Sequence, residues 1–150
     1  CARMITYKKV SVISVREKAE SPYGERIVKG IDTLPIILSL IPKGDEREHF
    51  LAIYLDTRNH VIGASVISIG CLDASIVHPR EVFRPAILLG AAHLIIAHNH
   101  PSGNVEPSAQ DCDITRRLQL AGDVIGITLV DHIIVNETGE FYAFQAKGRL

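Results

Sequence analysis

Hydrophobic and polar positions at the N-terminal end of the chain predict one strand and one short helix. Met4–Val15 is rich in Val and Ile and alternates in part between apolar and polar residues, which is typical of a β-strand. Residues 16–30 are charged and contain a proline and two glycines, which indicates a loop. A helix can begin at Asp32 or Thr33 and continue through Leu40, where a Pro-Lys-Gly-Asp sequence soon ends it.

The middle of the chain predicts a hairpin, a helix and a buried strand. Glu48–Leu55 and Val61–Ile69 are rich in strand-forming residues, and residues 56–60 between them suit a hairpin loop. Pro79–Ala92 is mostly apolar, with a proline at its start and an acidic residue in its first turn, so it predicts a helix. Leu94–Ala97 is short and wholly apolar, as expected for a strand that is buried on both faces.

The C-terminal part predicts a loop, a second helix and three strands. The loop covers Pro101–Pro107, and the helix begins at Ser108 and ends near Gly122. The strands are expected over Ile125–Val130, Ile133–Val135 and Glu140–Phe144. Because hairpins occur together with a strand–helix–strand passage, we expect an α/β (α+β) fold, either an α+β arrangement or a three-layer αβα arrangement.

Length, composition and charge then restrict the class of protein. A chain of 150 residues with 47% hydrophobic and 22% charged residues suits one globular domain. We expect this domain to span residues 1–150, with residues 1–44 as an N-terminal strand, loop and helix and residues 45–145 as its core. The net charge of −1 argues against a protein that holds nucleic acid mainly by bulk positive charge.

The cysteines and the apolar runs indicate the compartment. Cys1, Cys71 and Cys112 are odd in number and widely spaced, so we expect no disulfide framework and a reducing cytoplasm. The start of the chain lacks the apolar core of a signal peptide. The most membrane-like run, Pro85–Ala97, is too short to span a bilayer, so we expect no membrane contact. The oligomeric state stays open, and a homodimer is compatible with the sequence.

The most informative segment lies between residues 98 and 111. His98 and His100 are one residue apart at the end of a predicted strand, so their side chains point to the same side. After a loop with proline and glycine, Asp111 follows in the first turn of the next helix. Two imidazoles and a carboxylate are suitable ligands for Zn²⁺, and they leave a fourth position for water, as catalytic zinc sites do. The same ligands also suit iron or cobalt.

A hydrolytic zinc site also needs a general base. No glutamate lies between the two histidines, which excludes the helical His-Glu-x-x-His arrangement. Glu46 and Glu48, just before the apolar part of a predicted strand that starts near Phe50, are the candidates from the sequence. Ser108 and Asp111 also fit a helix N-cap with an acidic residue at the third helical position, which is a purely structural arrangement.

This segment resembles the metal-binding signature of the JAMM (JAB/MPN+) metalloproteases, which is His-x-His-Pro, six residues, Ser-x-x-Asp. Its fixed positions are all matched, by His98, His100, Pro101, Ser108 and Asp111. The flanking sequences Val-His-Pro-Arg-Glu-Val upstream and Asp-His downstream are similar to those of the bacterial RadC branch. The resemblance covers roughly residues 45–145.

The resemblance implies a JAMM/MPN-like (cytidine-deaminase-like) three-layer αβα fold with a mixed central sheet. It implies Zn²⁺ as the cofactor, with His98, His100 and Asp111 as ligands. It also implies that Ser108 polarises the scissile carbonyl and stabilises the oxyanion.

The family's catalytic glutamate lies upstream, at the start of a strand, where Glu48 is the match and Glu46 the second choice. Glu48 would take a proton from the zinc-activated water and pass it to the leaving amine. We therefore expect a metallopeptidase or isopeptidase that cleaves an amide bond in a peptide or protein substrate.

Two other functions are compatible with the resemblance. RadC-like proteins carry a DNA-repair label, so the chain could be a nucleic-acid-associated module or a zinc-dependent nuclease. The near-neutral charge and the lack of a helix-hairpin-helix-like segment upstream disfavour this alternative. An inert, protein-binding MPN scaffold is disfavoured by the intact set of ligand residues.

The remaining candidate side chains are expected to be structural. His132 matches the RadC pattern and is expected to support the site without ligating the metal. Cys112 is expected to be a packed thiol, and Arg116 and Arg117 to form a solvated helix face. The other histidines lack a partner at metal-binding spacing and are expected on the surface or in the core: His49, His60, His78 and His93.

Overall fold

The computed structural model describes residues 26–70 and 77–150 of the chain. The strand predicted over Met4–Val15, most of the loop predicted over residues 16–30, and Cys1 and Cys71 lie outside these residues. None of the helices within the described ranges is long and apolar enough to cross a membrane.

The described part of the chain contains both helices and strands, and α2 and α3 lie between strands in the chain order. In chain order they are the 3-10 helix η1 (Gly30–Thr33), helix α1 (Leu34–Leu40), strands β1 (Glu48–Leu55) and β2 (Val61–Gly70), helix α2 (Pro79–Leu89), strand β3 (His93–Asn99), helix α3 (Ala109–Ile125), strands β4 (Thr128–Val135) and β5 (Phe141–Ala143), and the 3-10 helix η2 (Gln145–Lys147).

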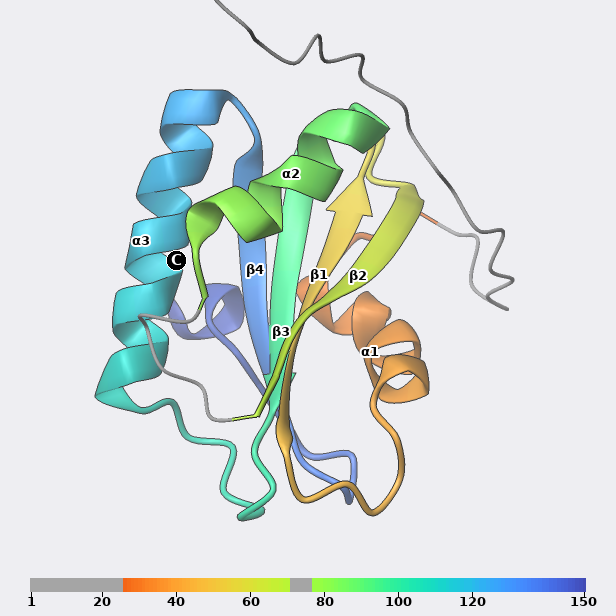
Figure 1. Cartoon of the computed structure of the whole chain (residues 1–150), viewed down its shortest axis with the longest axis vertical. Coiled ribbons are helices and arrows are strands. Elements are labelled where there is room, and N and C mark those ends of the chain that lie inside the picture. The colour runs from red at the N-terminus through yellow and green to blue at the C-terminus, as the bar shows by residue number, and fades with distance from the viewer. Residues whose placement is uncertain (1–25, 71–76) are drawn as a thin grey trace, which may run out of the picture.

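The strands form one mixed sheet in the order β2-β1-β3-β4-β5. Strand β1 pairs antiparallel with β2 and β3, whereas β3 and β4 are parallel. Parallel neighbours need a crossover connection, and α3 supplies it. Helices α2 and α3 cover one face of the sheet and α1 covers the other (Figure 1). The predicted mixed, three-layer αβα arrangement is therefore confirmed.

Strand β1 shows how the two cores are divided. Phe50, Ala52 and Tyr54 belong to the core under α2 and α3. Leu51 and Ile53, which alternate with them, belong to the core under α1. Successive side chains on a strand point to opposite faces, so a strand covered on both sides must be apolar throughout. The same rule places His98, at the end of β3, on the α3 side, because it pairs with Phe50.

Two predicted helix ends were wrong, and glycine conformation explains both. Helix α2 ends at Leu89, before the predicted Ala92, because Gly90 adopts a left-handed conformation with φ of 68°. Helix α3 continues past the predicted end at Gly122 to Ile125, because the left-handed glycine is Gly126, with φ of 85°.

Strand β4 corrects a third expectation. The sequence predicted two strands, Ile125–Val130 and Ile133–Val135, which are separated at Asp131 and His132. Buried polar residues are costly in a strand unless they are hydrogen-bonded. The structure has a single strand over Thr128–Val135 in which both residues are buried. The Asp131 carboxylate accepts hydrogen bonds from the backbone N–H groups of His132 and Gln145, at 2.8 and 3.0 Å. Its partners therefore allow Asp131 to occupy the strand interior.

Gly122, inside α3, lies close to the backbone that follows the helix. A Cβ atom at this position would lie 2.4 Å from the carbonyl oxygen of Ile127. We therefore predict that Gly122→Ala lowers the free energy of unfolding by about 1–3 kcal/mol, the usual range for overpacking, although alanine normally favours a helix. Urea denaturation measures this change.

Gly63→Ala is the matched control for Gly122→Ala. Its Cβ atom would lie 2.6 Å from Cδ1 of Leu89, the end of a side chain that can rotate. We expect Gly63→Ala to be the milder substitution. Equal or greater stability of Gly122→Ala relative to the wild type would contradict the packing described for α3.

Candidate functional site

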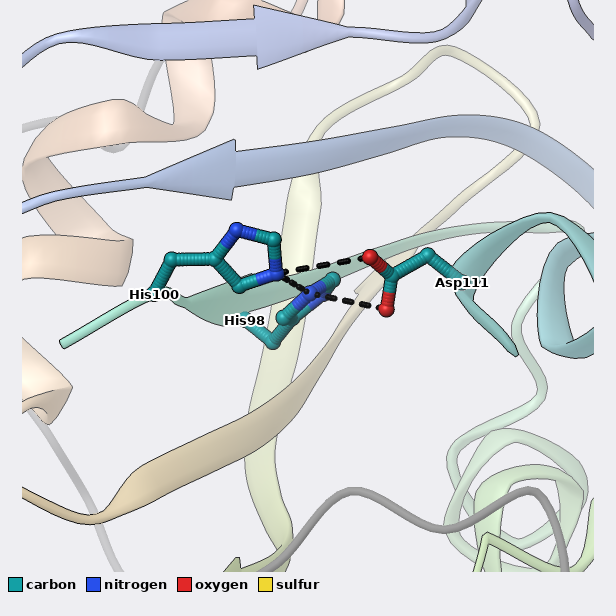
Figure 2. Close-up of side chains that lie close together, drawn as sticks. All are labelled: His98, His100 and Asp111. Atoms are coloured by element: carbon teal, nitrogen blue, oxygen red, sulfur yellow. Dashed lines mark hydrogen bonds and ion pairs between the residues drawn. The ribbon is translucent and has the colours of Figure 1, made fainter. Parts of the chain in front are cut away.

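The candidate site lies where β3 ends and α3 begins. His98 is the last but one residue of β3 and is fully buried, and His100 follows directly after the strand. Their side chains project to the face that α3 covers, and Figure 2 shows both imidazoles directed towards Asp111 at the start of α3. The end of β3 thus provides two imidazoles, and the start of α3 provides one carboxylate.

A capping box fixes the carboxylate of Asp111. The Ser108 side chain accepts a hydrogen bond from the backbone N–H of Asp111 at 3.1 Å, and Oδ2 of Asp111 accepts from the backbone N–H of Ser108 at 2.7 Å. These contacts satisfy helix N–H groups that lack a partner within the helix. The structural reading of Ser108 and Asp111 is therefore confirmed, and the same contacts hold the carboxylate towards the strand.

Three ligand atoms converge at one point (Figure 2). The Nε2 atoms of His98 and His100 lie 2.9 Å apart. Oδ1 of Asp111 lies 3.2 Å from Nε2 of His98, and Oδ2 lies 3.3 Å from Nε2 of His100. The side chain of His98 is 0% exposed and that of His100 is 13% exposed, so the site is recessed but reachable from the His100 side.

These positions fit a divalent metal ion. Zinc–nitrogen distances of 2.0–2.1 Å in a tetrahedral site place neighbouring ligand atoms about 3.3 Å apart, close to the distances found here. Nδ1 of His100 lies 2.6 Å from the backbone oxygen of Asn104, which can only accept, so Nδ1 carries the hydrogen. The lone pair of a neutral His100 therefore lies on Nε2 and faces the other two groups. Among the described residues, this is the one His/Cys/Asp/Glu group that could hold a metal ion.

The electrostatics of the site couple His100 to Asp111. Burial raises the pKa of Asp111, but the facing His100 and His98 side chains outweigh burial and hold this pKa well below its ordinary value. The hydrogen bond to Asp111 raises the pKa of His100, and the charge of Glu48 acts in the same direction. A proton on His100 and a metal ion therefore compete for the same nitrogen.

Glu48 lies at the edge of this site. Phe50 pairs with His98 in antiparallel register, so continuing the register by two residues sets Glu48 beside His100. Paired residues share one face of a sheet, so Glu48 belongs to the face that carries both histidines. Its effect on the pKa of His100 agrees with this placement. Glu46, the second choice, is exposed and precedes β1.

Asn99 holds the backbone on both sides of Glu48. Its Oδ1 accepts from the backbone N–H of His49 at 2.6 Å, and its Nδ2 donates to the backbone oxygen of Arg47 at 3.0 Å. Asn99 stands between the two histidines in sequence and points to the opposite face of β3. The residue between two candidate ligands therefore fixes the segment that carries the candidate base.

A second layer of side chains lies behind His98. Nε2 of His132 is 2.8 Å from Nδ1 of His98, and Nδ1 of His132 is 2.6 Å from the Thr115 hydroxyl oxygen. Burial holds the pKa of His132 well below its ordinary value, so the ring is neutral. His132 contacts a candidate ligand and is outside the metal-binding group, which agrees with the supporting position predicted for it.

The other candidate side chains lie outside this group. Cys112 is partly buried and packs against a small apolar cluster near the C-terminus, as a packed thiol would. Arg116 and Arg117 are exposed on α3. The remaining described histidines are buried or partly buried away from the three ligand atoms: His49, His60, His78 and His93.

Three residues of the site were not predicted from the sequence: Thr115, Asn99 and Asn104. Thr115 follows Asp111 by four residues, a spacing that places both on one helix face and that could have drawn attention to it. Asn99 lies between two histidines, and alternation in a strand, which sends its side chain to the opposite face, could have drawn attention to it. Asn104 acts through its backbone, which no sequence signal reveals.

Comparison with known proteins identifies relatives of this chain. A family model described as a RadC-like JAB domain matches residues 32–149. The chain is 55% identical over 105 residues to a UPF0758 protein of Rubrobacter xylanophilus, a match that covers 70% of this chain and 45% of the relative. It is 50% identical over 106 residues to a UPF0758 protein of Shouchella clausii, covering 71% of this chain and 46% of the relative. The chain thus spans about half the length of these relatives.

The coupling between His100 and Asp111 generates a prediction for pH. The raised pKa of His100 means that metal-free protein keeps the His100 proton to higher pH, where zinc must displace it. We predict that zinc affinity rises by about tenfold per pH unit below this pKa and levels off above it. The zinc-induced increase in Tm should accordingly be larger at pH 8 than at pH 6.

The stability of the metal-free protein should change with pH in the opposite direction and fall as pH rises. A protonated His100 beside Asp111 stabilises the fold, and this contribution is complete below the unfolded pKa of about 6.5 and is lost as pH rises through the folded pKa. Asp111→Asn removes the carboxylate that raises the pKa and should flatten this dependence. A zinc affinity that is constant between pH 6 and 8 would contradict the coupling.

Proposed function

The chain belongs to the RadC-like JAB domain family, and we propose that it is a zinc-dependent hydrolase that cleaves an amide bond in a peptide or protein substrate. The observation that carries this proposal is the convergence of His98, His100 and Asp111, with ligand atoms 2.9–3.3 Å apart. Three protein ligands leave a coordination position for water or substrate, the arrangement of catalytic zinc sites.

The side chains around the metal-binding group supply the roles that hydrolysis needs. When bound, zinc polarises a carbonyl group and lowers the pKa of water to about 7. Glu48, beside His100, accepts a proton from the attacking water and then donates it to the leaving amine. The backbone contacts of Asn99 hold Glu48 in place for both transfers.

Ser108 can serve the helix and the reaction together. Its oxygen accepts the capping hydrogen bond from Asp111, which leaves its hydroxyl hydrogen free to donate. Ser108 is also exposed, so a substrate can approach it. The hydroxyl hydrogen donates to the carbonyl oxygen of the substrate as negative charge develops there.

The direct test combines metal removal with two matched pairs of variants. The purified protein is incubated with a quenched-fluorescent peptide library, with or without a chelator, and zinc is then restored. We predict cleavage that the chelator abolishes and zinc restores. Asp111→Asn should lose zinc and activity, whereas Asp113→Asn, an exposed position on the same helix, should lose neither.

The second pair tests the general base. Glu48→Gln should keep zinc and lose about 10²–10⁴-fold in turnover, the usual contribution of a general base. Glu46→Gln should leave turnover unchanged. Zinc stoichiometry near one without cleavage of any peptide would contradict the hydrolase proposal and favour an inert scaffold, whereas zinc-dependent DNA nicking that Asp111→Asn removes would favour the nuclease alternative.

The role of Ser108 has its own test. Ser108→Ala should lower the free energy of unfolding by about 1 kcal/mol through loss of the N-cap, and should lower turnover by about 10²–10³-fold. Zinc content should stay at one ion per chain. Ser108→Thr keeps the capping oxygen and the hydroxyl donor and should retain stability and turnover. Loss of zinc in Ser108→Ala would show that the assigned role is wrong.

A further inference from the structure

Three buried side chains behind the candidate metal site are linked by hydrogen bonds. Nδ1 of His98 lies 2.8 Å from Nε2 of His132, and Nδ1 of His132 lies 2.6 Å from Oγ1 of Thr115. The Thr115 hydroxyl also contacts the backbone oxygen of Asp111 at 2.6 Å. All three side chains are at most 3% exposed, so the hydrogens in these contacts come from the groups themselves.

The direction of each hydrogen bond follows from the contact between the Thr115 hydroxyl and the backbone oxygen of Asp111. A backbone oxygen can only accept, so the single hydroxyl hydrogen of Thr115 is donated to Asp111. The Thr115 oxygen can then only accept from the His132 ring, which places a hydrogen on Nδ1 of His132.

The same reasoning continues to His98. A buried imidazole without a carboxylate contact is neutral, so His132 carries one hydrogen, on Nδ1, and its Nε2 accepts. Nδ1 of His98 must therefore donate to it. The lone pair of His98 is left on Nε2, the atom that faces His100 and Asp111.

We propose that Thr115 and His132 select the ring tautomer of His98 that can bind zinc, and that both are positioning residues for the metal. This inference rests on the zinc site proposed above. A free imidazole can carry its hydrogen on either nitrogen, and a hydrogen on Nε2 of His98 would block the ligand atom. Partners of this kind orient ligand histidines in zinc proteins in general.

The ring tautomers of His98 and His100 are fixed by different groups. The backbone oxygen of Asn104 fixes the hydrogen of His100, whereas side chains fix that of His98. Thr115 lies one helical turn after Asp111, so α3 provides a candidate ligand and also the group that begins the series. Strand β4 provides His132 between them. The site therefore depends on the packing of α3 against β4 as well as on the three ligands.

Substitution of Thr115 tests this inference through zinc affinity. Thr115→Val removes the hydroxyl with little change of shape, so Nδ1 of His132 loses its acceptor. The His132 hydrogen should then move to Nε2 and force the His98 hydrogen onto the metal-binding nitrogen. We predict a zinc Kd weaker by about 10–100-fold, measured by competition with a chromophoric chelator. Thr115→Ser restores the hydroxyl and should restore the affinity.

Thr33→Val is the matched control. Thr33 is also buried, and its hydroxyl donates to the backbone oxygen of Gly30 at 2.6 Å, on the face that α1 covers. This variant loses the same kind of hydrogen bond and should bind zinc as the wild type does. A zinc Kd for Thr115→Val equal to those of the wild type and Thr33→Val would overturn the inference, as would a failure of Thr115→Ser to restore affinity.

Long-range ¹H–¹⁵N NMR of the metal-free wild type shows which ring nitrogen of each histidine carries the hydrogen. This measurement needs neither zinc nor activity, so it tests the inference even if Thr115→Val does not fold. We expect hydrogens on Nδ1 of both His98 and His132. A hydrogen on Nε2 of either ring would overturn the inference. Failure of the proposed function is separate from this outcome, because it appears as a wild type that binds no zinc or that binds zinc and cleaves no peptide.

Discussion

A buried carboxylate facing two imidazoles is the interaction on which the rest of the site depends. Asp111 is only 3% exposed, and an ionised group at such depth is costly unless it is paired and hydrogen-bonded. The surroundings meet this requirement in two ways: the Ser108 N–H binds the carboxylate within the helix, and His98 and His100 face it from the strand. The topology brings Asp111 close to the two histidines. Because α3 connects β3 to the parallel strand β4, the start of α3 lies near the end of β3.

Most of the fold could be predicted from local pattern. The alternation in β1, the apolar core of β3 and the hairpin between β1 and β2 were sufficient to predict a mixed sheet with helices on both faces. The errors occurred where a local signal had two meanings. Gly122 was taken as a helix end, although it lies inside α3. A glycine is needed at this position because the backbone of Ile127 lies too close for a side chain. The gap predicted between two strands at Asp131 and His132 is absent from β4, because groups distant in sequence, Gln145 and Thr115, hydrogen-bond these two buried side chains.

For the candidate site, too, one part could be predicted from the sequence and another part could not. The spacing of His98, His100 and Asp111 predicted side chains that could meet, because strand alternation and the first turn of a helix both have fixed geometry. The groups that support them could not be predicted, since Thr115 and Asn99 act through contacts set by tertiary packing. The DNA-related alternative and the general base stay predictions, since only solution experiments separate them from the hydrolase proposed here. Nucleic-acid association would appear as DNA binding that weakens with salt.

We propose that His98, His100 and Asp111 share one metal ion. An anomalous-scattering map, recorded at the zinc absorption edge from crystals grown with equimolar zinc, can locate such an ion. We expect one strong peak about 2.0–2.2 Å from Nε2 of His98, Nε2 of His100 and an oxygen of Asp111. A map without a peak at this position, or with zinc bound only elsewhere on the chain, would contradict it.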